Sequence, residues 1–215
     1  MQNEETTGAS GVDTPTETST PPVRKRPKPG ERRVQILQAL AAMLEQPGAE
    51  RVTTAALAAR LEVSEAALYR HFASKAQMFE GLIDFIEQSV FTLINQITDR
   101  SAPGQEQAAR IIAMLVQFAE KNPGMTRVMV GDALVYENER LQNRMNQFFD
   151  KIEATLRQAL RGAATAEGSA TPSVDAQVRA AALTAFVVGQ LQRFARSGFR
   201  RAPSEHLDAT IALIV

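Results

Sequence analysis

The sequence predicts an all-α protein of about nine helices, and three features support this prediction. From Glu31 to the end of the chain, apolar residues recur every three or four positions, which is the period of a helix with one buried face. The chain lacks the strict apolar–polar alternation of half-buried strands, and it lacks internal repeats. Proline, glycine and capping residues interrupt the pattern at intervals that suit helix lengths.

Composition limits the class of protein. The chain has 215 residues, of which 44% are hydrophobic, enough for one medium globular body with a small domain attached. Because cysteine is absent, disulfides and thiolate metal sites are excluded. The N-terminus lacks the features of a secretory signal, and no apolar stretch reaches the roughly 18–20 residues of a membrane span. We therefore expect a soluble cytoplasmic protein.

The formal net charge is zero, but the charges are unevenly distributed along the chain. Residues 1–23 hold four acidic and no basic residues, residues 24–75 hold ten Lys and Arg against five Asp and Glu, and residues 76–215 hold fourteen against fifteen. The positive excess therefore lies in one short segment. Such a concentration is typical of a surface that binds phosphate groups.

Residues 1–30 are rich in Thr, Ser, Pro, Gly and Glu and contain few apolar residues, so we expect a disordered tail. This tail ends in a basic run over 24–28. That run suits contact with nucleic-acid phosphates, but a solvated linker has the same composition.

Residues 31–75 predict a compact domain of three helices. The first helix begins at Glu31, is expected to bury Val34, Leu37, Leu40, Ala41 and Leu44, and is stopped by Pro47-Gly48. Thr53-Thr54 caps a short helix through Leu61, and Ser64 caps another through Phe72. Since helices of two turns are not stable alone in water, both must pack on the first helix.

Residues 76–215 predict a helical body. The form Ser74-x-x-Gln77 is that of a capping box and opens a long helix to about Arg100 with a continuous apolar face. Further helices are expected up to Lys121, from Asn122-Pro123 onward, and over about 139–161, 174–200 and 203–214. The Gly, Ala, Ser and Thr of residues 162–173 predict a mobile loop.

The two short helices of the first domain have the layout of a helix-turn-helix. Alanines at 55, 56, 58 and 59 allow close approach of the helices, and apolar residues at 57, 61, 63 and 68 fill the angle between them. The second helix is then free to enter the major groove of DNA. The alternative is that Ala-rich helices simply pack together.

The predicted DNA-binding residues are polar or basic side chains near these helices. Arg70 and Tyr69 are positioned to reach bases or phosphates, and Thr53 lies at a helix N-terminus, which favours phosphate. The full predicted set is Arg32, Arg33, Thr53, Thr54, Ser64, Tyr69, Arg70, His71 and Lys75.

The same residues resemble a known family. The pattern Thr53-Thr54, Leu57-Ala58, then Val63-Ser64-x-x-Ala67-Leu68-Tyr69-Arg70-His71-Phe72-x-Ser74-Lys75 is similar to the TetR family of transcriptional regulators. The resemblance implies an all-helical fold with a three-helix helix-turn-helix head joined to a helical-bundle dimerisation body. It also implies double-stranded DNA as a partner.

The body resembles one branch of that family, the nucleoid occlusion factors. The strings that carry this resemblance are Glu120–Arg127, Gly131–Leu134 and Glu139–Phe149. It implies a nucleoid-associated homodimer that binds chromosomal palindromes and antagonises the division protein FtsZ, so that no septum forms over the nucleoid. Asp132 replaces His of the family pattern, Lys121 replaces Arg, and the basic tail is longer than usual.

One apolar side chain points away from the predicted core. Phe85 lies roughly 120° from the apolar stripe of the long helix at about 100° per residue. On the following helix, a second face carries polar and basic residues. A surface of this kind suits a peptide with acidic and aliphatic groups. With the resemblance, the predicted FtsZ-binding residues are Phe85, Arg110, Met114, Gln117, Lys121 and Asn122. The alternative is that Phe85 and Met114 pack within the body.

Dimerisation is predicted near the C-terminus. The segment 180–191 is apolar nearly all round, which a surface helix would not tolerate. With residues 211–215 it predicts a symmetric four-helix interface, which matches a two-fold palindrome.

No enzymatic activity is expected. The chain has only two histidines, His71 and His206, and no phosphate-binding loop or spaced metal ligands, so we expect no catalytic residues, metal or cofactor. Glu137 and Glu139 are interpreted as solvated helix charges. The main alternative is a repressor released from its operator by a small ligand in an apolar pocket. Such a ligand is less expected, because the body has no Trp and only one Tyr, Tyr136. A DNA-bridging protein would need filament contacts that the sequence does not indicate.

Overall fold

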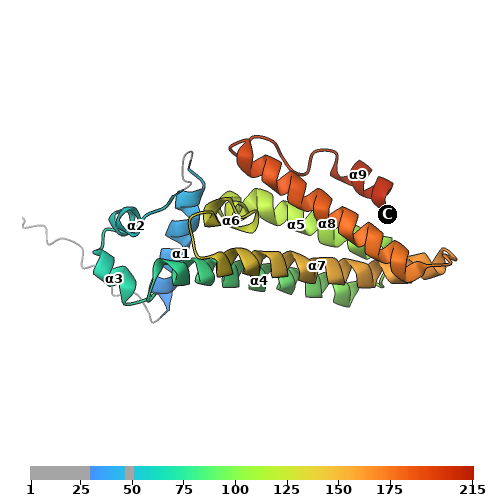
Figure 1. Cartoon of the computed structure of the whole chain (residues 1–215), viewed down its shortest axis with the longest axis horizontal. Coiled ribbons are helices and arrows are strands. Elements are labelled where there is room, and N and C mark those ends of the chain that lie inside the picture. The colour runs from blue at the N-terminus through green and yellow to red at the C-terminus, as the bar shows by residue number, and fades with distance from the viewer. Residues whose placement is uncertain (1–29, 47–50) are drawn as a thin grey trace, which may run out of the picture.

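The computed structural model describes residues 30–46 and 51–215. Within this part the chain forms nine α-helices, one short 3-10 helix and no strand, as predicted (Figure 1). The predicted tail over 1–30 lies outside the described residues apart from Gly30. The helices are α1 Glu31–Leu44, α2 Thr54–Arg60, α3 Glu65–Tyr69, α4 Lys75–Arg100, α5 Gln105–Lys121, α6 Pro123–Met129, η1 Asp132–Leu134, α7 Glu139–Ala166, α8 Pro172–Arg196 and α9 Leu207–Ile214.

The three N-terminal helices lie together at one end of the molecule (Figure 1). The predicted caps are present: the Thr53 hydroxyl accepts a hydrogen bond from the Ala56 amide at 3.2 Å, and the Ser64 hydroxyl accepts one from Ala67 at 3.3 Å. α3 ends at Tyr69 rather than at Phe72, although Phe72 is fully buried below it.

The buried face of α1 differs from the prediction at three positions. Leu40, Ala41 and Leu44 are buried as predicted, but Val34 is exposed and Leu37 is only half-buried. Ile36 is fully buried, although the sequence pattern does not predict it. Val34 lies at the edge of the apolar stripe, and the helix is rotated so that α4 and α6 cover the other edge.

α4 joins the head to the body and has the predicted bounds. The Ser74 hydroxyl accepts a hydrogen bond from the Gln77 amide at 3.2 Å, and the Gln77 side chain accepts one from the Ala73 amide at 2.8 Å. The second bond is one residue earlier than in a capping box, but it also satisfies a free amide at the helix start.

In the body, α7 runs alongside α4, and α8 returns beside α7 (Figure 1). The predicted loop over 162–173 is too long, because α7 continues to Ala166 and α8 begins at Pro172, so only residues 167–171 connect the two helices. Ala164 is buried in α7, and alanine is the strongest helix former, so the small residues extend the helix. η1 was not predicted.

Among the residues that the structure describes, no helix combines the length and the apolar character that crossing a membrane requires.

Candidate DNA-binding and partner-binding faces

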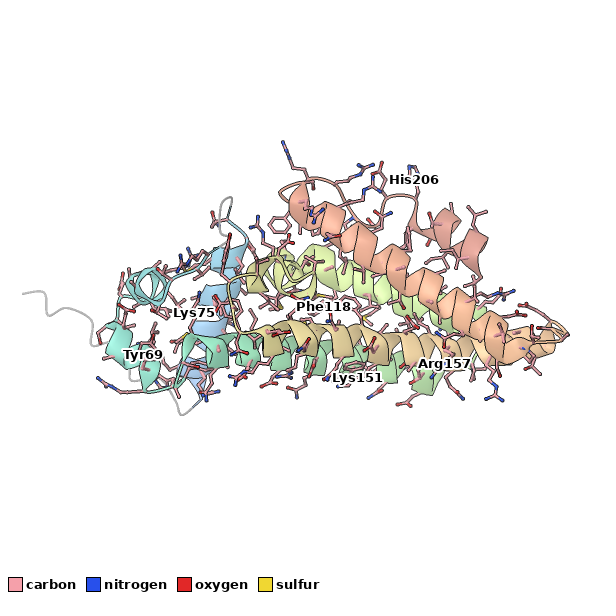
Figure 2. All side chains as sticks on the ribbon, viewed as in Figure 1. Tyr69, Lys75, Phe118, Lys151, Arg157 and His206 are labelled. Carbon is pink, nitrogen blue, oxygen red and sulfur yellow. The ribbon has the colours of Figure 1, made fainter. Side chains whose placement is uncertain are left out.

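α3 presents its polar residues at the far end of the head. Tyr69 and Arg70 are exposed, and His71 is half-buried. Figure 2 shows Tyr69 on α3, at the end of the molecule away from α8 and α9. The exposed part of α3 therefore brings Tyr69 and Arg70 to a surface that the body does not cover.

The N-terminus of α2 is held against α3. The Thr54 hydroxyl donates a hydrogen bond to the Glu65 carboxylate at 2.5 Å, so its hydroxyl is already engaged. Thr53 is exposed, and its side chain caps α2. Both predicted threonines thus have local structural roles besides any contact with phosphate.

The two arginines of α1 are also engaged. The Arg33 guanidinium donates a hydrogen bond to the His71 carbonyl and lies 4.0 Å from the centroid of the Phe72 ring. Arg32 donates to the Gln35 side chain at 3.0 Å. Arg33 therefore ties α1 to the chain that leaves α3.

Lys75, the first residue of α4, forms an ion pair with Glu137. The Lys75 side chain is 27% exposed and that of Glu137 only 10%, and Figure 2 shows Lys75 where head and body meet. The interpretation of Glu137 as a solvated helix charge is wrong, because it lies in the turn before α7 with a paired carboxylate. Glu139 does lie exposed at the start of α7.

The face with Phe85 lies between α4 and α5. Phe85 is 49% exposed, as its angular position predicts. Leu93 continues the apolar face that the sequence predicts for the long helix, with Val90 one turn before it and Ile97 one turn after it, but it is 37% exposed. A groove of about 250 Å³ continues this face, and its lining residues are Leu93, Gln96, Ile97, Arg100, Arg110 and Met114.

The register of the two helices places Lys121 and Asn122 near the level of Phe85, whereas Arg110 and Met114 line the groove closer to Arg100. α4 and α5 are antiparallel, and the groove brings Leu93 level with Met114. Phe85 is two turns earlier on α4, and Asn122 is two turns beyond Met114 at the end of α5. The face between α4 and α5 therefore extends from Arg100 to Lys121 and Asn122; we call it the α4–α5 face.

Several side chains on the α4–α5 face have partners. Arg110 forms an ion pair with Glu106 one turn earlier. The Asn122 side chain donates a hydrogen bond to the Phe118 carbonyl at 2.7 Å, so it closes α5 and does not cap α6. Met114 is half-buried against the core and also lines the groove. It therefore packs within the body and is accessible on the α4–α5 face at the same time.

Four groove residues lie outside the set that the sequence predicts: Leu93, Gln96, Ile97 and Arg100. The spacing of Leu93 in the sequence predicts a core residue. That these residues of α4 line one groove with Arg110 of α5 depends on how the two antiparallel helices are aligned. The one signal in the sequence for this groove is Arg100, a basic residue at the end of the long helix.

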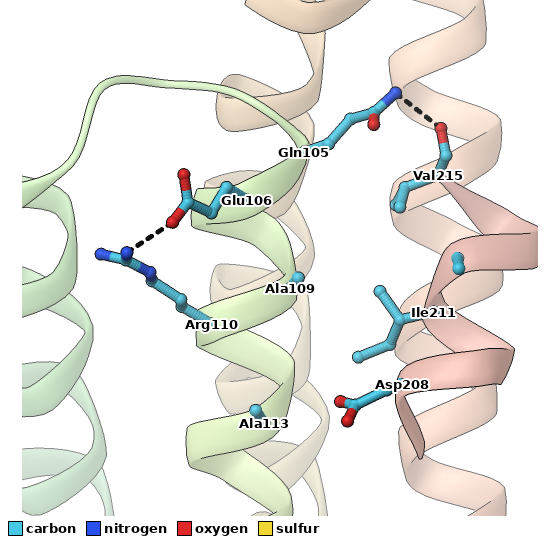
Figure 3. Close-up of a pocket in the computed structure, with 9 residues that line it drawn as sticks. Gln105, Glu106, Ala109, Arg110, Ala113, Asp208, Ile211 and Val215 are labelled. Atoms are coloured by element: carbon cyan, nitrogen blue, oxygen red, sulfur yellow. Dashed lines mark hydrogen bonds and ion pairs between the residues drawn. The ribbon is translucent and has the colours of Figure 1, made fainter. Parts of the chain in front are cut away.

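A second groove adjoins the first. It has a volume of about 490 Å³ and lies between α5 and α9 (Figure 3). The Gln105 amide donates a hydrogen bond to the Val215 carbonyl at 2.8 Å and closes one end. Arg110 lines both grooves and separates them.

Family profiles match both parts of the chain. Residues 36–82 match the family described as bacterial regulatory proteins, tetR family. Residues 106–215 match the SlmA-like family described as tetracyclin repressor-like, C-terminal domain.

Solved structures share the fold. A transcriptional regulator FadR from Bacillus subtilis in complex with stearoyl-CoA superposes with a TM-score of 0.67 at 14% identity, covering 85% of this chain and 97% of that chain. FadR from Bacillus halodurans gives a TM-score of 0.69 at 14% identity over 87% and 96% of the two chains. At such identity the likeness shows the fold alone.

Curated relatives are much closer in sequence. The nucleoid occlusion factor SlmA of Photobacterium profundum is 52% identical over 182 residues, which cover 84% of this chain and 92% of that protein. The protein of the same name from Vibrio cholerae serotype O1 is 51% identical over 184 residues, covering 85% and 93%. The chain belongs to the TetR family and, within it, to the SlmA family of nucleoid occlusion factors.

Proposed function

We propose that this chain acts as a homodimer that binds palindromic chromosomal sites and, when bound, antagonises FtsZ polymers, so that no septum forms over the nucleoid. The observation that carries the proposal is identity of about 50% to proteins named nucleoid occlusion factor across both head and body. This role places the protein in the cytoplasm, associated with the nucleoid.

DNA is bound by the head. The exposed Tyr69, the last residue of α3, and Arg70, which follows it, supply contacts in the major groove, where an arginine pairs with guanine through two hydrogen bonds. Thr53 at the start of α2 and Lys75 at the start of α4 supply phosphate contacts, which set the position of α3 but do not select bases.

The dimer is formed through α8. One face of this helix carries the exposed residues Val174, Val178, Ala182 and Ala185, at spacings of four and three. A line of exposed aliphatic and small side chains is typical of a helix that packs against a symmetric copy. α9 packs on α5 and α8 of its own chain and buries Leu207 and Ile211, but Leu213 is 88% exposed. Leu213 is therefore available to the interface together with the exposed face of α8.

FtsZ is bound by the α4–α5 face. Leu93 and Met114 form its apolar centre, and Phe85 adds an exposed aromatic ring nearer the end that carries Lys121. Arg100 at one end and Lys121 at the other are exposed and form no ion pair among the described residues. An extended or helical segment with aliphatic residues between acidic residues satisfies both features.

The test is co-sedimentation of FtsZ polymers with the purified protein, with and without a duplex that it has selected from genomic fragments. We expect less FtsZ in the pellet when protein and duplex are both present than with either alone. A duplex of scrambled sequence is the control. Equal amounts of polymer in all samples would contradict the proposal and favour a ligand-released repressor.

A further inference from the structure

We propose that Glu137 occupies the phosphate site at the start of α4 in the free protein, so that DNA binding must exchange Glu137 for phosphate on Lys75. This inference rests on the proposed phosphate contact of Lys75. The Lys75–Glu137 ion pair connects the head to the turn before α7, and DNA binding breaks this connection.

The pair is held from both sides. Lys75 is fixed as the first residue of α4, and its ammonium lies 5.6 Å from the centroid of the Phe79 ring. The Glu137 amide donates a hydrogen bond to the Leu134 carbonyl at 3.0 Å, which fixes the turn that carries its side chain. The chain thus brings together two residues that are 62 positions apart.

The ammonium of Lys75 is the group that attracts the anion. In the free protein it is paired with the Glu137 carboxylate. A DNA phosphate that contacts Lys75 must approach the same ammonium, so carboxylate and phosphate compete for one cation.

The exchange leaves the Glu137 carboxylate without its cation, and this affects the turn that leads into the body. The Glu137 side chain is only 10% exposed, and a largely buried carboxylate that loses its cation is destabilised where it lies. The turn relieves this cost by moving its carboxylate into water. Val135 and Tyr136, which precede Glu137, are already exposed, so little packing opposes that movement.

The moved turn leads into α7, which lies alongside α4. Beyond Lys75, α4 and α7 are joined by ion pairs of Glu80 with Arg140 at 2.8 Å and of Asp84 with Arg144 at 2.7 Å. Phe85 is the residue after Asp84. Loss of the Lys75–Glu137 ion pair therefore loosens the contact between α7 and α4, the helix that carries Phe85 of the α4–α5 face.

The test is the DNA affinity of Glu137→Gln, measured by fluorescence anisotropy on the selected duplex over a series of salt concentrations. Glutamine keeps the size of the side chain and removes its charge. We expect about fivefold tighter binding, which corresponds to about 1 kcal/mol for removal of the competing charge. We also expect the slope of log affinity against log salt to steepen by up to about one, because no freed carboxylate then recaptures a cation.

Two controls separate this exchange from a structural effect. Glu139→Gln removes an exposed charge two residues away and should leave both affinity and slope unchanged. In a Lys75→Met background, Glu137→Gln should no longer tighten binding, because the cation for which phosphate and carboxylate compete is absent. Melting temperatures show that each variant is folded, and Glu137→Asp, with a shorter reach, should fall between wild type and Glu137→Gln.

Unchanged or weaker binding by folded Glu137→Gln would overturn the inference alone. So would a gain in affinity that persists without Lys75. Failure of the wild-type protein to bind any duplex would overturn the proposed function together with the inference.

Discussion

Gly124 on α6 lies directly against the backbone of Ala41 on α1. A methyl group on Gly124 would be 2.0 Å from the Ala41 carbonyl oxygen and 2.9 Å from its carbonyl carbon. Because these atoms belong to a helix backbone, they cannot turn away as a side chain would. Gly124 therefore sets how closely the first helix of the head approaches the body.

Gly124→Ala should lower the stability of the protein by about 1–3 kcal/mol or more, since the added methyl must separate α1 from α6. Thermal unfolding followed by circular dichroism measures this loss. The control is Gly162→Ala in α7, where the methyl would be 3.6 Å from the nearest atom, on Pro103. This control should be neutral or stabilising by up to about 1 kcal/mol. Equal melting of both variants would show that α1 and α6 are less closely packed than described.

Ser64 combines a cap with a place on the predicted DNA surface, and two substitutions separate these roles. Ser64→Ala loses the hydrogen bond to the Ala67 amide and should cost about 1 kcal/mol of stability. Ser64→Asp keeps the cap, because aspartate is an equally good capping residue, but adds a negative charge close to phosphate. We therefore expect near wild-type melting but weaker DNA binding for Ser64→Asp. Unimpaired duplex binding by this variant would place Ser64 away from the DNA.

Arg144 joins α7 to α4 through two carboxylates, at 2.7 Å from an oxygen of Asp84 and 2.7 Å from one of Glu87. Burial lowers the pKa of the Arg144 guanidinium, but hydrogen bonds and charges from Glu87 and Asp84 outweigh this and raise the pKa overall. Arg144→Gln should cost about 1 kcal/mol, a modest loss because the group is partly exposed to water. Arg157→Gln is the control, since Arg157 contacts only the neutral Gln177 side chain among the interactions described. Urea unfolding curves should show a lower midpoint for Arg144→Gln alone.

The proposed dimer depends on the exposed apolar face of α8. Val178→Glu places a charge in the centre of that face and should convert dimers to monomers, which sedimentation velocity measures directly. Gln88→Glu adds the same charge to an exposed position of α4 and should remain dimeric. A Val178→Glu protein that sediments as a dimer would place the interface elsewhere.

Local sequence signals predicted the helix starts well. Thr53, Ser64 and Ser74 all cap the helices that they were expected to cap, because capping depends on residues three positions apart. The loop over 162–173 is predicted too long, because Ala163 and Ala164 stand among Gly, Ser and Thr in the sequence, although alanine itself favours helix. The rotation of α1 could not be read, because which edge of its stripe is buried depends on α4 and α6.

The candidate faces show the same limit. The exposure of Phe85 followed from its angle on one helix. The roles of Leu93 and Arg100 required the register of α4 against α5, and the ion pair of Lys75 with Glu137 joins residues 62 positions apart. Contacts between distant segments depend on tertiary packing, which the spacing of apolar residues does not encode.

The central claim is that the DNA surface and the FtsZ surface are separate, and it is tested most directly by measuring both activities on Arg70→Ala and Phe85→Ala. Arg70→Ala should bind the selected duplex about 10- to 100-fold more weakly, corresponding to roughly 1–3 kcal/mol for a lost arginine contact. Phe85→Ala should bind the duplex like wild type but leave FtsZ polymers intact in the presence of saturating duplex. Wild-type action of Phe85→Ala on FtsZ, or loss of duplex binding in this variant, would contradict the account.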